Sequence, residues 1–472
     1  MKHFYFLSLL LLSSCTKDAN TLFELQSSNT TNINFSNNLT ETEKENILSY
    51  EYFYNGGGVG AGDFNNDGLI DLFFAGNQVE NALYINKGQL KFEDVSKKAN
   101  INSKKGTWST GVSVVDINAD GLLDMYICNS GLRDEQLRKN QLLINQGITN
   151  GIPVFADKAE EYGLADSGYS SQAAFLDYDQ DGDLDCFLIN HNLAGYERKE
   201  AHVMRAAYDY NAGDKLFRNV GINPTTHTCK FTDISTSAGI KSNPLGFGLG
   251  VSVSDINQDG LLDIYVANDF VEDDYLYINQ GNGTFKDQLR DYIEHTSYSS
   301  MGVDIADINN DLLPDILTTD MLPEDNARQK LLVWPDNWNV YQAQLQNGFW
   351  HQNMRNMLQL NNGNSSFSEV GQLAGISNTD WSWAVLMSDF DLDRNKDIFI
   401  SNGIGKDFTN IDFIKYSEDF HRENKSLLEE LKTMPNSQTQ NYIFKNTGNI
   451  TFTNQQKQWG FDDFTISNAV IG

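Results

Sequence analysis

The chain has 472 residues, and its 64 acidic and 34 basic side chains give a formal net charge of −30 at pH 7. This acidity, with no basic patch along the chain, disfavours a nucleic-acid partner. No segment beyond residue 12 is long and apolar enough to cross a membrane, so we expect membrane contact only through a lipid anchor.

The N-terminus predicts export. A short basic start precedes the apolar run Phe4 to Leu12, which is too short to span a bilayer as a mature helix. Leu12-Ser-Ser-Cys15 then resembles a lipobox, in which Cys15 is lipidated after cleavage; an ordinary signal peptide with an incidental cysteine is the alternative. We therefore expect a signal peptide and lipobox over 1–15, a tether over 16–20, and an outer-membrane lipoprotein whose surface exposure is open.

One nine-residue pattern recurs six times along the rest of the chain. It starts at an aspartate and places oxygen side chains at positions 1, 3, 5 and 9, which is the donor set that a hard cation such as Ca²⁺ prefers. Position 7 is expected to add its backbone carbonyl. The predicted Ca²⁺ ligands, loop by loop, are Asp63, Asn65, Asp67, Leu69 and Asp71; Asp116, Asn118, Asp120, Leu122 and Asp124; Asp177, Asp179, Asp181, Asp183 and Asp185; Asp255, Asn257, Asp259, Leu261 and Asp263; Asp307, Asn309, Asp311, Leu313 and Asp315; and Asp389, Asp391, Asp393, Asn395 and Asp397.

Two alternatives to this kind of calcium loop are an EF-hand and a metal-free hairpin. An EF-hand needs a bidentate glutamate at position 12 and a following helix, but position 12 is apolar or threonine in all six loops, as at Phe74 and Thr318. The residues after each loop are typical of strands instead, as in Met125 to Cys128. A surface hairpin of Asp, Asn and Gly that binds no metal is the remaining alternative.

The repeat extends beyond the loop and predicts the fold. A strand rich in small residues precedes each loop, where another backbone approaches closely, and two further strands follow, the last starting at a phenylalanine such as Phe92 or Phe285. Four antiparallel strands per unit at this period predict an all-β propeller over 21–472, with helical insertions.

The two ends of this region predict an incomplete seventh blade. Thr21 to Leu25 resembles the phenylalanine-led fourth strand, and Thr465 to Gly472 resembles a first strand. We expect six calcium-loop blades plus a seventh that lacks its two middle strands. The chain would then be a C-terminally truncated part of a longer protein with exposed strand edges.

At this point the residues resemble a known family. The loops and strands are similar to FG-GAP/VCBS repeats, the calcium-loop blades of integrin-type propellers. Segments such as Gly248 to Asn257, Asp320 to Asp325, His351 to Asn356 and Asp380 to Trp383 resemble VCBS-repeat lipoproteins of Bacteroidetes, related to the cartilage acidic protein/ASPIC group. The resemblance implies a propeller whose loop aspartates bind Ca²⁺, and it implies little about activity.

The six loops differ in quality. The fifth has Leu312 and the sixth Arg394 where the others have glycine, and a non-glycine residue holds a left-handed turn at some cost. We expect these two sites to be the weaker ones. The third loop has five aspartates and Gly182, and is expected to be the best formed.

The insertions supply the candidate ligand site. The insertion at Glu324 to Met357 is rich in aromatic residues, and we take Trp334, Trp338, Trp350 and His351 as candidate ligand-binding residues, with core packing as the competing role. His295, His351 and Tyr298 are weak acid/base candidates, because nothing in the sequence pairs them with a nucleophile. We therefore expect a non-enzymatic binding module for protein or glycan; a polysaccharide lyase or hydrolase is the alternative.

Overall fold

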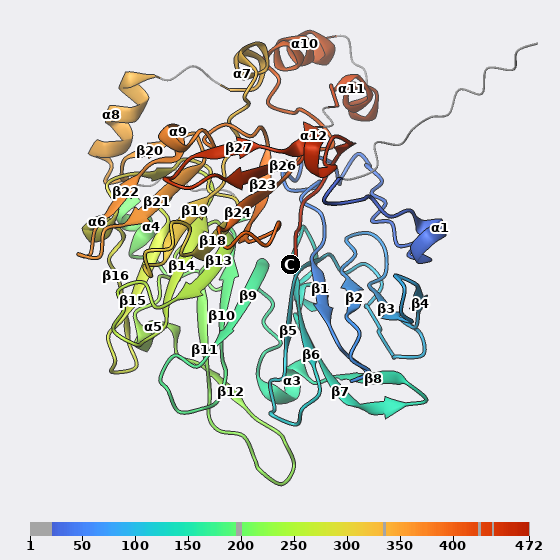
Figure 1. Cartoon of the computed structure of the whole chain (residues 1–472). Helices are drawn as coiled ribbons and strands as arrows, with labels where there is room; N and C mark the ends of the chain where they lie inside the picture. The colour runs from blue at the N-terminus through green and yellow to red at the C-terminus, as the bar shows by residue number, and fades with distance from the viewer. Residues whose placement is uncertain (1–20, 195–200, 334–336, 423–425, 437–438, 472) are drawn as a thin grey trace, which may run out of the picture.

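Each of the six repeats folds into a four-stranded antiparallel sheet, and the six sheets are the blades of a β-propeller (Figure 1). The computed structural model describes residues 21–194, 201–333, 337–422, 426–436 and 439–471. Cys15 and Trp334 therefore lie outside the described residues. In every blade the strands follow one another in chain order across the sheet, which confirms the fold class expected from the repeat.

The first three blades contain twelve consecutive strands. They are β1 (Val59–Gly62), β2 (Asp71–Phe74), β3 (Ala82–Asn86) and β4 (Phe92–Asp94); β5 (Ser109–Val115), β6 (Asp124–Asn129), β7 (Gln141–Thr149) and β8 (Ile152–Asp157); and β9 (Ser170–Leu176), β10 (Asp185–Asn190), β11 (Lys215–Asn219) and β12 (Phe231–Asp233).

The other three blades are built in the same way. They contain β13 (Gly248–Ser254), β14 (Asp263–Asn268), β15 (Tyr275–Asn279) and β16 (Phe285–Asp287); β18 (Val303–Ala306), β19 (Asp315–Thr318), β21 (Met357–Asn361) and β22 (Phe367–Glu369); and β23 (Ser382–Ser388), β24 (Asp397–Asn402), β26 (Tyr442–Asn446) and β27 (Phe452–Asn454). Two short pairs lie outside the blades: β17 (Thr296–Ser297) with β20 (Gln352–Asn353), and β25 (Thr439–Gln440) with β28 (Phe464–Thr465).

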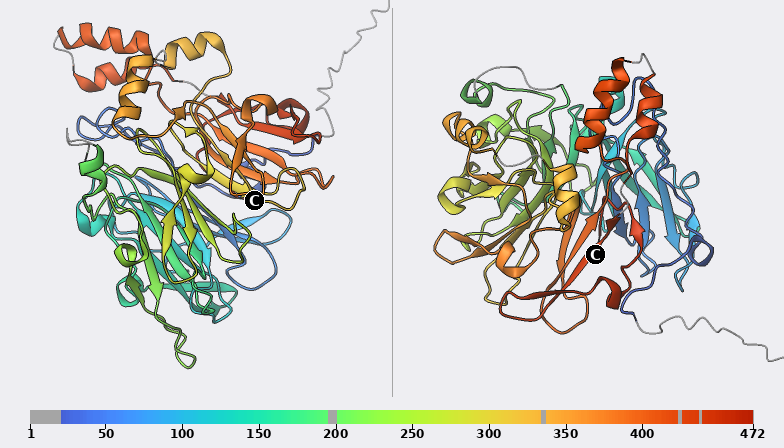
Figure 2. Two further views of the ribbon diagram at one scale, coloured as in Figure 1. Left: turned by 90° about the vertical axis from the view of Figure 1, so that its left-hand side faces the viewer. Right: turned by 90° about the horizontal axis from the view of Figure 1, so that it is seen from above.

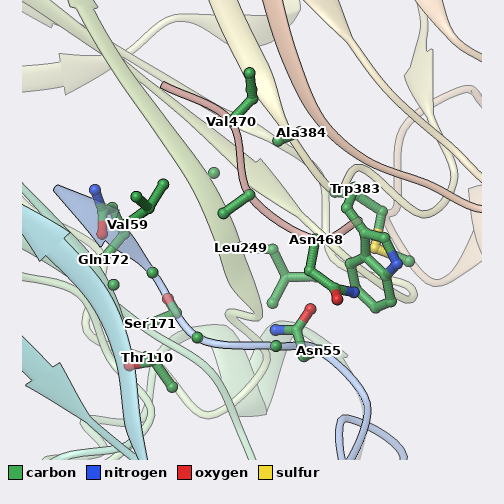
Figure 3. A pocket seen from close by; sticks show the side chains of 18 of the residues that line it. Asn55, Val59, Thr110, Ser171, Gln172, Leu249, Trp383, Ala384, Asn468 and Val470 are labelled. Carbon is green, nitrogen blue, oxygen red and sulfur yellow. The ribbon is translucent and has the colours of Figure 1, made fainter. Parts of the chain in front are cut away.

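The first strand of each blade lies nearest the central axis, and this explains its small residues. At Gly111 in β5, an added Cβ would lie 1.8 Å from the Gln172 side chain and 2.4 Å from the Ser171 carbonyl of the next blade. A side chain there would therefore force neighbouring first strands apart. The first strands surround a central cavity of about 270 Å³ (Figure 3).

The hydrophobic core lies between neighbouring blades rather than in one central cluster. One cluster joins the first and second blades through residues such as Phe73 and Ile127, and another joins the third and fourth through Phe187 and Tyr277. Cys128 and Cys186 are buried free thiols in the cluster between the second and third blades, as expected for small apolar residues. Each blade is therefore stabilised by its neighbours.

Helices occur in the N-terminal segment, in the connections between second and third strands, and in the turns after the fourth strands. The longer ones are α7 (Asn326–Leu332), α8 (Trp338–Gln346), α10 (Ile411–Arg422) and α11 (Leu427–Thr433), which gather at one end of the molecule (Figure 2). The short ones are α1 (Ser28–Thr31), α2 (Glu135–Arg138), α3 (Ala159–Tyr162), α4 (Ala201–Arg205), α5 (Ser235–Ala238), α6 (Leu289–Tyr292), α9 (Gly371–Ala374) and α12 (Gln456–Trp459). None of the described helices is long and apolar enough to cross a membrane.

Residues 39–54 cover one mouth of the ring, which the repeat pattern did not predict. Ile47, Tyr50, Tyr52 and Phe53 are buried in one cluster with Trp108, Phe247, Met301, Trp381, Trp383 and residues of α10 and α11. Trp381 and Trp383 are each 6% exposed, so both pack inside this cluster. The N-terminal segment therefore connects the inner ends of most blades.

The N-terminal segment packs beside the sixth blade, on the side away from the central axis. The Phe23 N–H donates to the Trp459 carbonyl at 2.9 Å, just as the Phe155 N–H in the fourth strand of the second blade donates to the Ala99 carbonyl at 2.9 Å. An added Cβ on Gly460 would lie 2.4 Å from the Phe23 carbonyl, matching the contact of Gly163 with Phe231. Phe23 therefore takes the place of a fourth-strand phenylalanine.

The C-terminal segment packs beside the same blade, on the side nearer the central axis. The Ser467 N–H donates to Asn402 at the end of β24, at 2.9 Å, as Ser109 at the start of β5 donates to Gly76. Asn468 contacts Gly56 ahead of β1 and lines the central cavity (Figure 3). The described residues nevertheless form six four-stranded blades and no seventh four-stranded sheet. The expected truncation stays a prediction.

Candidate metal-binding loops

Each nonapeptide folds into the same tight loop between the first and second strands of its blade. In the first loop, Asp63 Oδ1 accepts a hydrogen bond from the Asp67 N–H at 3.0 Å, and Asp63 Oδ2 accepts one from the Gly68 N–H at 2.7 Å. The equivalent two bonds recur in the other five loops. The aspartate at position 1 thus closes the loop on itself.

The aspartate at position 9 begins the second strand and is buried in all six blades. Asp71 accepts hydrogen bonds from the Phe64 N–H at 3.0 Å and the Asn86 N–H at 2.8 Å, and every other blade repeats both. Position 9 therefore connects the loop to the third strand through the backbone. The asparagine at that point of the third strand is explained by its side chain: Asn86 Nδ2 donates to the Ile70 carbonyl, and its Oδ1 accepts from the Gly88 N–H, both at 2.9 Å.

Burial raises the pKa of all six position-9 carboxyl groups, and the backbone donors only partly oppose this. The pKa rises to about 6 for Asp71, Asp263, Asp315 and Asp397, and to about 7 for Asp124 and Asp185. Nearby loop aspartates raise it further. A divalent cation would reverse this effect, since it stabilises the ionised form.

The residue at position 3 divides the loops into two classes. Four loops have asparagine there, and its side chain donates to the position-5 carboxylate, as Asn65 Nδ2 does to Asp67 Oδ2 at 3.0 Å. The third and sixth loops have Asp179 and Asp391 instead. In these two, the carboxylates at positions 1, 3 and 9 have oxygens within 4.8 Å of one another, a grouping that could hold a metal ion.

The donor set fits Ca²⁺. The side chains at positions 1, 3, 5 and 9 of the loops are all Asp or Asn, with no sulfur or imidazole in the pattern. Asp179 Oδ1 and Asp391 Oδ1 are buried, and no hydrogen-bond partner is found for either within the described residues. A buried oxygen without a donor is costly, and a cation would satisfy it.

The fifth and sixth loops adopt the same backbone as the others despite lacking glycine. Leu312 and Arg394 have φ of 72° and 78°, against 81° to 92° for the four glycines at this position. Their N–H groups make the expected bonds to Asp307 and Asp389. The loop therefore keeps its backbone conformation although a non-glycine residue disfavours the positive φ at this position. In the third loop, Asp183 Oδ2 accepts from the Ile222 N–H outside the loop, at 3.2 Å.

Neighbouring loops are linked to one another, a feature that the sequence pattern did not reveal. The position-4 side chain of one loop donates to the position-6 carbonyl of the next, as Gln180 does to Gly260 at 2.8 Å and Gln258 to Leu312 at 2.6 Å. Asn66 and Asn310 make the same link at 3.2 Å. Ala119 in the second loop has no side-chain donor, so the run of links is interrupted there.

The candidate ligand residues lie at the opposite end of the blades from these loops. Trp338 on α8 is 71% exposed, and its ring lies 5.7 Å from that of Tyr341. The Tyr341 hydroxyl lies 2.6 Å from His351 Nδ1, and His351 packs edge-on against Trp350. Trp350 is anchored, because its Nε1 donates to the Ile293 carbonyl at 3.0 Å. Three of the four predicted residues thus form one aromatic patch, and Trp334 is outside the described residues.

The acid/base candidates are engaged in other contacts. His295 lies 3.5 Å from Glu369, which also pairs with Arg355 at 3.2 Å. The Tyr298 hydroxyl accepts a long hydrogen bond from Gln344 on α8, at 3.5 Å. His295 and His351 directly precede the parallel strands β17 and β20, and the Thr296 N–H donates to the His351 carbonyl at 2.9 Å, so the two histidines lie at the same end of this pair.

Comparisons with known proteins identify the repeat. The FG-GAP-like repeat family matches residues 63–127 and 255–318, which contain the first, second, fourth and fifth loops. Cartilage acidic protein 1 of Xenopus tropicalis is 27% identical over 217 residues, which are 46% of this chain and 29% of that protein. The chain therefore contains FG-GAP-like repeats, is distantly related to cartilage acidic protein 1, and matches under a third of that relative's length.

The chain also has weak structural similarity to three solved structures. A lectin of Agrocybe aegerita that recognises non-reducing terminal N-acetylglucosamine has a TM-score of 0.43 and 13% identity, with 84% of this chain and 78% of that chain covered. An exotype rhamnogalacturonan lyase has a TM-score of 0.35 and 13% identity, covering 75% and 54%. A Trypanosoma rangeli sialidase complex has a TM-score of 0.34 and 12% identity, covering 72% and 51%.

Proposed function

We propose that this protein is a calcium-stabilised propeller that acts as a binding module for a protein or glycan ligand. The main supporting observation is the sixfold repetition of one loop, with the same position-1 and position-9 hydrogen bonds in every blade. Six equivalent loops in a ring suit a structural role for the cation, because a single catalytic site would not need six copies. The cation would offset the cost of burying six position-9 carboxylates.

The ligand surface is proposed at the helical end of the ring. The loops join first and second strands, whereas α4, α7, α8, α10 and α11 lie in connections between second and third strands, at the other end of each second strand. Calcium and ligand would then occupy opposite faces. Calcium would support binding indirectly, by keeping the blades in place.

The aromatic patch on α8 is the proposed contact surface. Trp338 is 71% exposed and Val340 is 54% exposed, and an apolar surface of this kind on a rigid scaffold is typical of an interaction site. The anchored Trp350 and the Tyr341–His351 hydrogen bond hold its base in position. An exposed tryptophan can stack on a sugar ring or fill a pocket of a protein partner.

A glycan array probed with this protein carrying a fluorescent label, in Ca²⁺ and in EGTA, tests this proposal. Binding should be lost in Trp338→Ala and retained in Leu373→Ala, a matched removal of an apolar side chain that is 82% exposed on α9. Equal binding by both variants would place the ligand elsewhere. An array without hits, combined with Trp338-dependent capture of one purified protein, would favour the protein ligand.

We propose binding rather than catalysis as the activity. In support, His191 is fully buried and its pKa is lowered by burial to about 3, and His295 is paired with Glu369. Asp320 accepts hydrogen bonds from the N–H groups of Tyr298, Ser299 and Arg355, which assigns it a structural role. Release of unsaturated or reducing sugar ends from any polysaccharide on the array would favour the alternative, a lyase or hydrolase.

The cellular location is proposed from the N-terminal sequence. Cleavage before Cys15 and its lipidation would leave a five-residue tether ahead of the propeller. Metabolic labelling with a fatty-acid analogue tests this: we expect label on the wild-type protein and none on Cys15→Ser. Labelled Cys15→Ser protein would exclude this cysteine as the anchor.

A further inference from the structure

The third and sixth blades each have a basic residue at a third-strand position where the other four blades have an aliphatic one. The residue before the final asparagine of the third strand is Arg218 in the third blade and Lys445 in the sixth. In the other blades the equivalent residue is aliphatic: Ile85, Ile144, Ile278 and Leu360. The two basic residues therefore occur in the same two blades as aspartate at position 3.

The contacts explain this coincidence. Lys445 Nζ forms an ion pair with Asp391 Oδ2 at position 3, and lies 2.8 Å from Asp393 Oδ2 at position 5. Arg218 Nε lies 3.1 Å from Asp179 Oδ2, and its Nη2 lies 3.8 Å from Asp181 Oδ2. Each basic group thus bridges positions 3 and 5 of its loop.

The four asparagine loops make the same bridge with a neutral group. Asn257 Nδ2 donates to Asp259 Oδ2 at 2.9 Å, and Asn309 Nδ2 donates to Asp311 Oδ2 at 2.9 Å. An aspartate at position 3 has no such donor and adds a negative charge beside position 5. A basic side chain from the third strand supplies both the donor and the opposite charge.

We propose that Arg218 and Lys445 are internal counterions that hold the third and sixth loops together without metal and lower the Ca²⁺ affinity of these two sites. This inference rests on the proposed calcium role of the loops. A bound Ca²⁺ would have to share its position-3 and position-5 carboxylates with a neighbouring unit positive charge, which repels it. The propeller then has two classes of site, set by paired residues at position 3 and on the third strand.

The proposal changes the expected order of the sites. The number of aspartates alone would rank the third loop first. However, Asp183 accepts a hydrogen bond from outside the loop, and Asp179 is paired with Arg218. The aspartate that adds charge at position 3 comes with a cation that cancels it. We therefore expect the four asparagine loops to depend most on Ca²⁺ for their structure.

Lys445→Met tests the proposal, with Lys286→Met as the control for loss of one positive charge, since Lys286 is in β16 and its side chain is 60% exposed. Calorimetric titration with Ca²⁺ should show one site whose affinity rises on the order of tenfold in Lys445→Met and is unchanged in the control. In EGTA, the melting temperature of Lys445→Met should fall below that of the control.

A double variant, Asp391→Asn with Lys445→Leu, converts the sixth loop into the asparagine class. It should recover the wild-type melting temperature in EGTA, because the amide replaces the ion pair. The proposal would be overturned if Lys445→Met had an unchanged Ca²⁺ affinity and the same melting temperature in EGTA as Lys286→Met. It would also be overturned if the double variant were no more stable in EGTA than Lys445→Met. If wild-type protein binds no Ca²⁺, the calcium proposal fails, and the EGTA comparison still tests the bridging role.

Discussion

Asp274 is a buried carboxyl group at a position where four of the six blades have asparagine. The residue before each third strand accepts a hydrogen bond from the N–H at or just beyond the end of the second strand, as Asp274 Oδ1 does from Asn268 at 2.9 Å. The equivalent residues are Asn81, Asn140, Asp214, Asn356 and Asn441. The position therefore requires a side-chain carbonyl oxygen, and a carboxylate is not needed.

The second blade shows how asparagine satisfies the same surroundings. Asn140 Nδ2 donates to the Tyr126 hydroxyl at 3.0 Å and to Ser170 Oγ at 2.9 Å. In the fourth blade the direction is reversed, since the Tyr265 and Ser300 hydroxyls donate to Asp274 Oδ2 at 2.7 and 2.9 Å. Hydroxyl groups can rotate to accept instead. Asp274→Asn should therefore keep every partner.

Burial raises the pKa of Asp274 to about 7, although its hydrogen-bond donors oppose this rise. A carboxyl with a raised folded-state pKa favours folding fully below its unfolded pKa of about 4, and this stabilisation is lost as the pH rises through 7. A tenfold change in the acid dissociation constant is worth about 1.4 kcal/mol. Asp274→Asn should therefore raise the free energy of unfolding by about 2–4 kcal/mol at pH 8 and leave it nearly unchanged at pH 4.

Thermal unfolding at pH 5 and pH 8, with saturating Ca²⁺ in every sample, measures this effect. The reverse variant Asn140→Asp is the matched control, and we expect it to destabilise the protein at pH 8 more than at pH 5. An Asp274→Asn protein that melts below wild type at pH 8, or that differs from it equally at both pH values, would show that burial of this charge is not the dominant cost.

The loops supply three further predictions. Adding EGTA should lower the melting temperature strongly: at Ca²⁺ about tenfold above Kd each site adds ~1.4 kcal/mol, so six sites approach ~8 kcal/mol, and an unchanged melting curve would contradict the calcium role. The difference in melting temperature between samples in Ca²⁺ and samples in EGTA should grow from pH 5 to pH 8. The position-9 carboxyl groups, such as Asp124, have raised pKa values of about 6–7 and must ionise to bind the cation. A difference that shrinks as the pH rises would refute this. Ala119→Asn should raise the free energy of unfolding in urea by about 0.5–1 kcal/mol, because asparagine tolerates the φ of 54° at this position and supplies the missing hydrogen bond to the third loop. Ala119→Ser is the control: its side chain is too short to make this hydrogen bond, so it should give none of the stabilisation that the bond provides.

The sequence by itself determined the repeat, the blade and the loop. Their bonds are local: Asp63 binds N–H groups four and five residues away, and the alternation of strands and turns needs no distant partner. A pattern formed by neighbours in the chain recurs at fixed spacing and can be recognised directly. The positions of Leu312 and Arg394 show the limit of such recognition, because the rest of the loop enforces a backbone that their side chains disfavour.

The tertiary structure decided what fills the ring and which charges meet. Residues 39–54 pack against Trp108, Phe247 and Trp383 only because ring closure brings the inner ends of four blades together. Lys445 reaches Asp391 across 54 residues of sequence, because a helical insertion separates the second and third strands of that blade. Such contacts join segments whose separation differs from blade to blade, so no fixed spacing marks them, and only the packed blades show which side chains are partners.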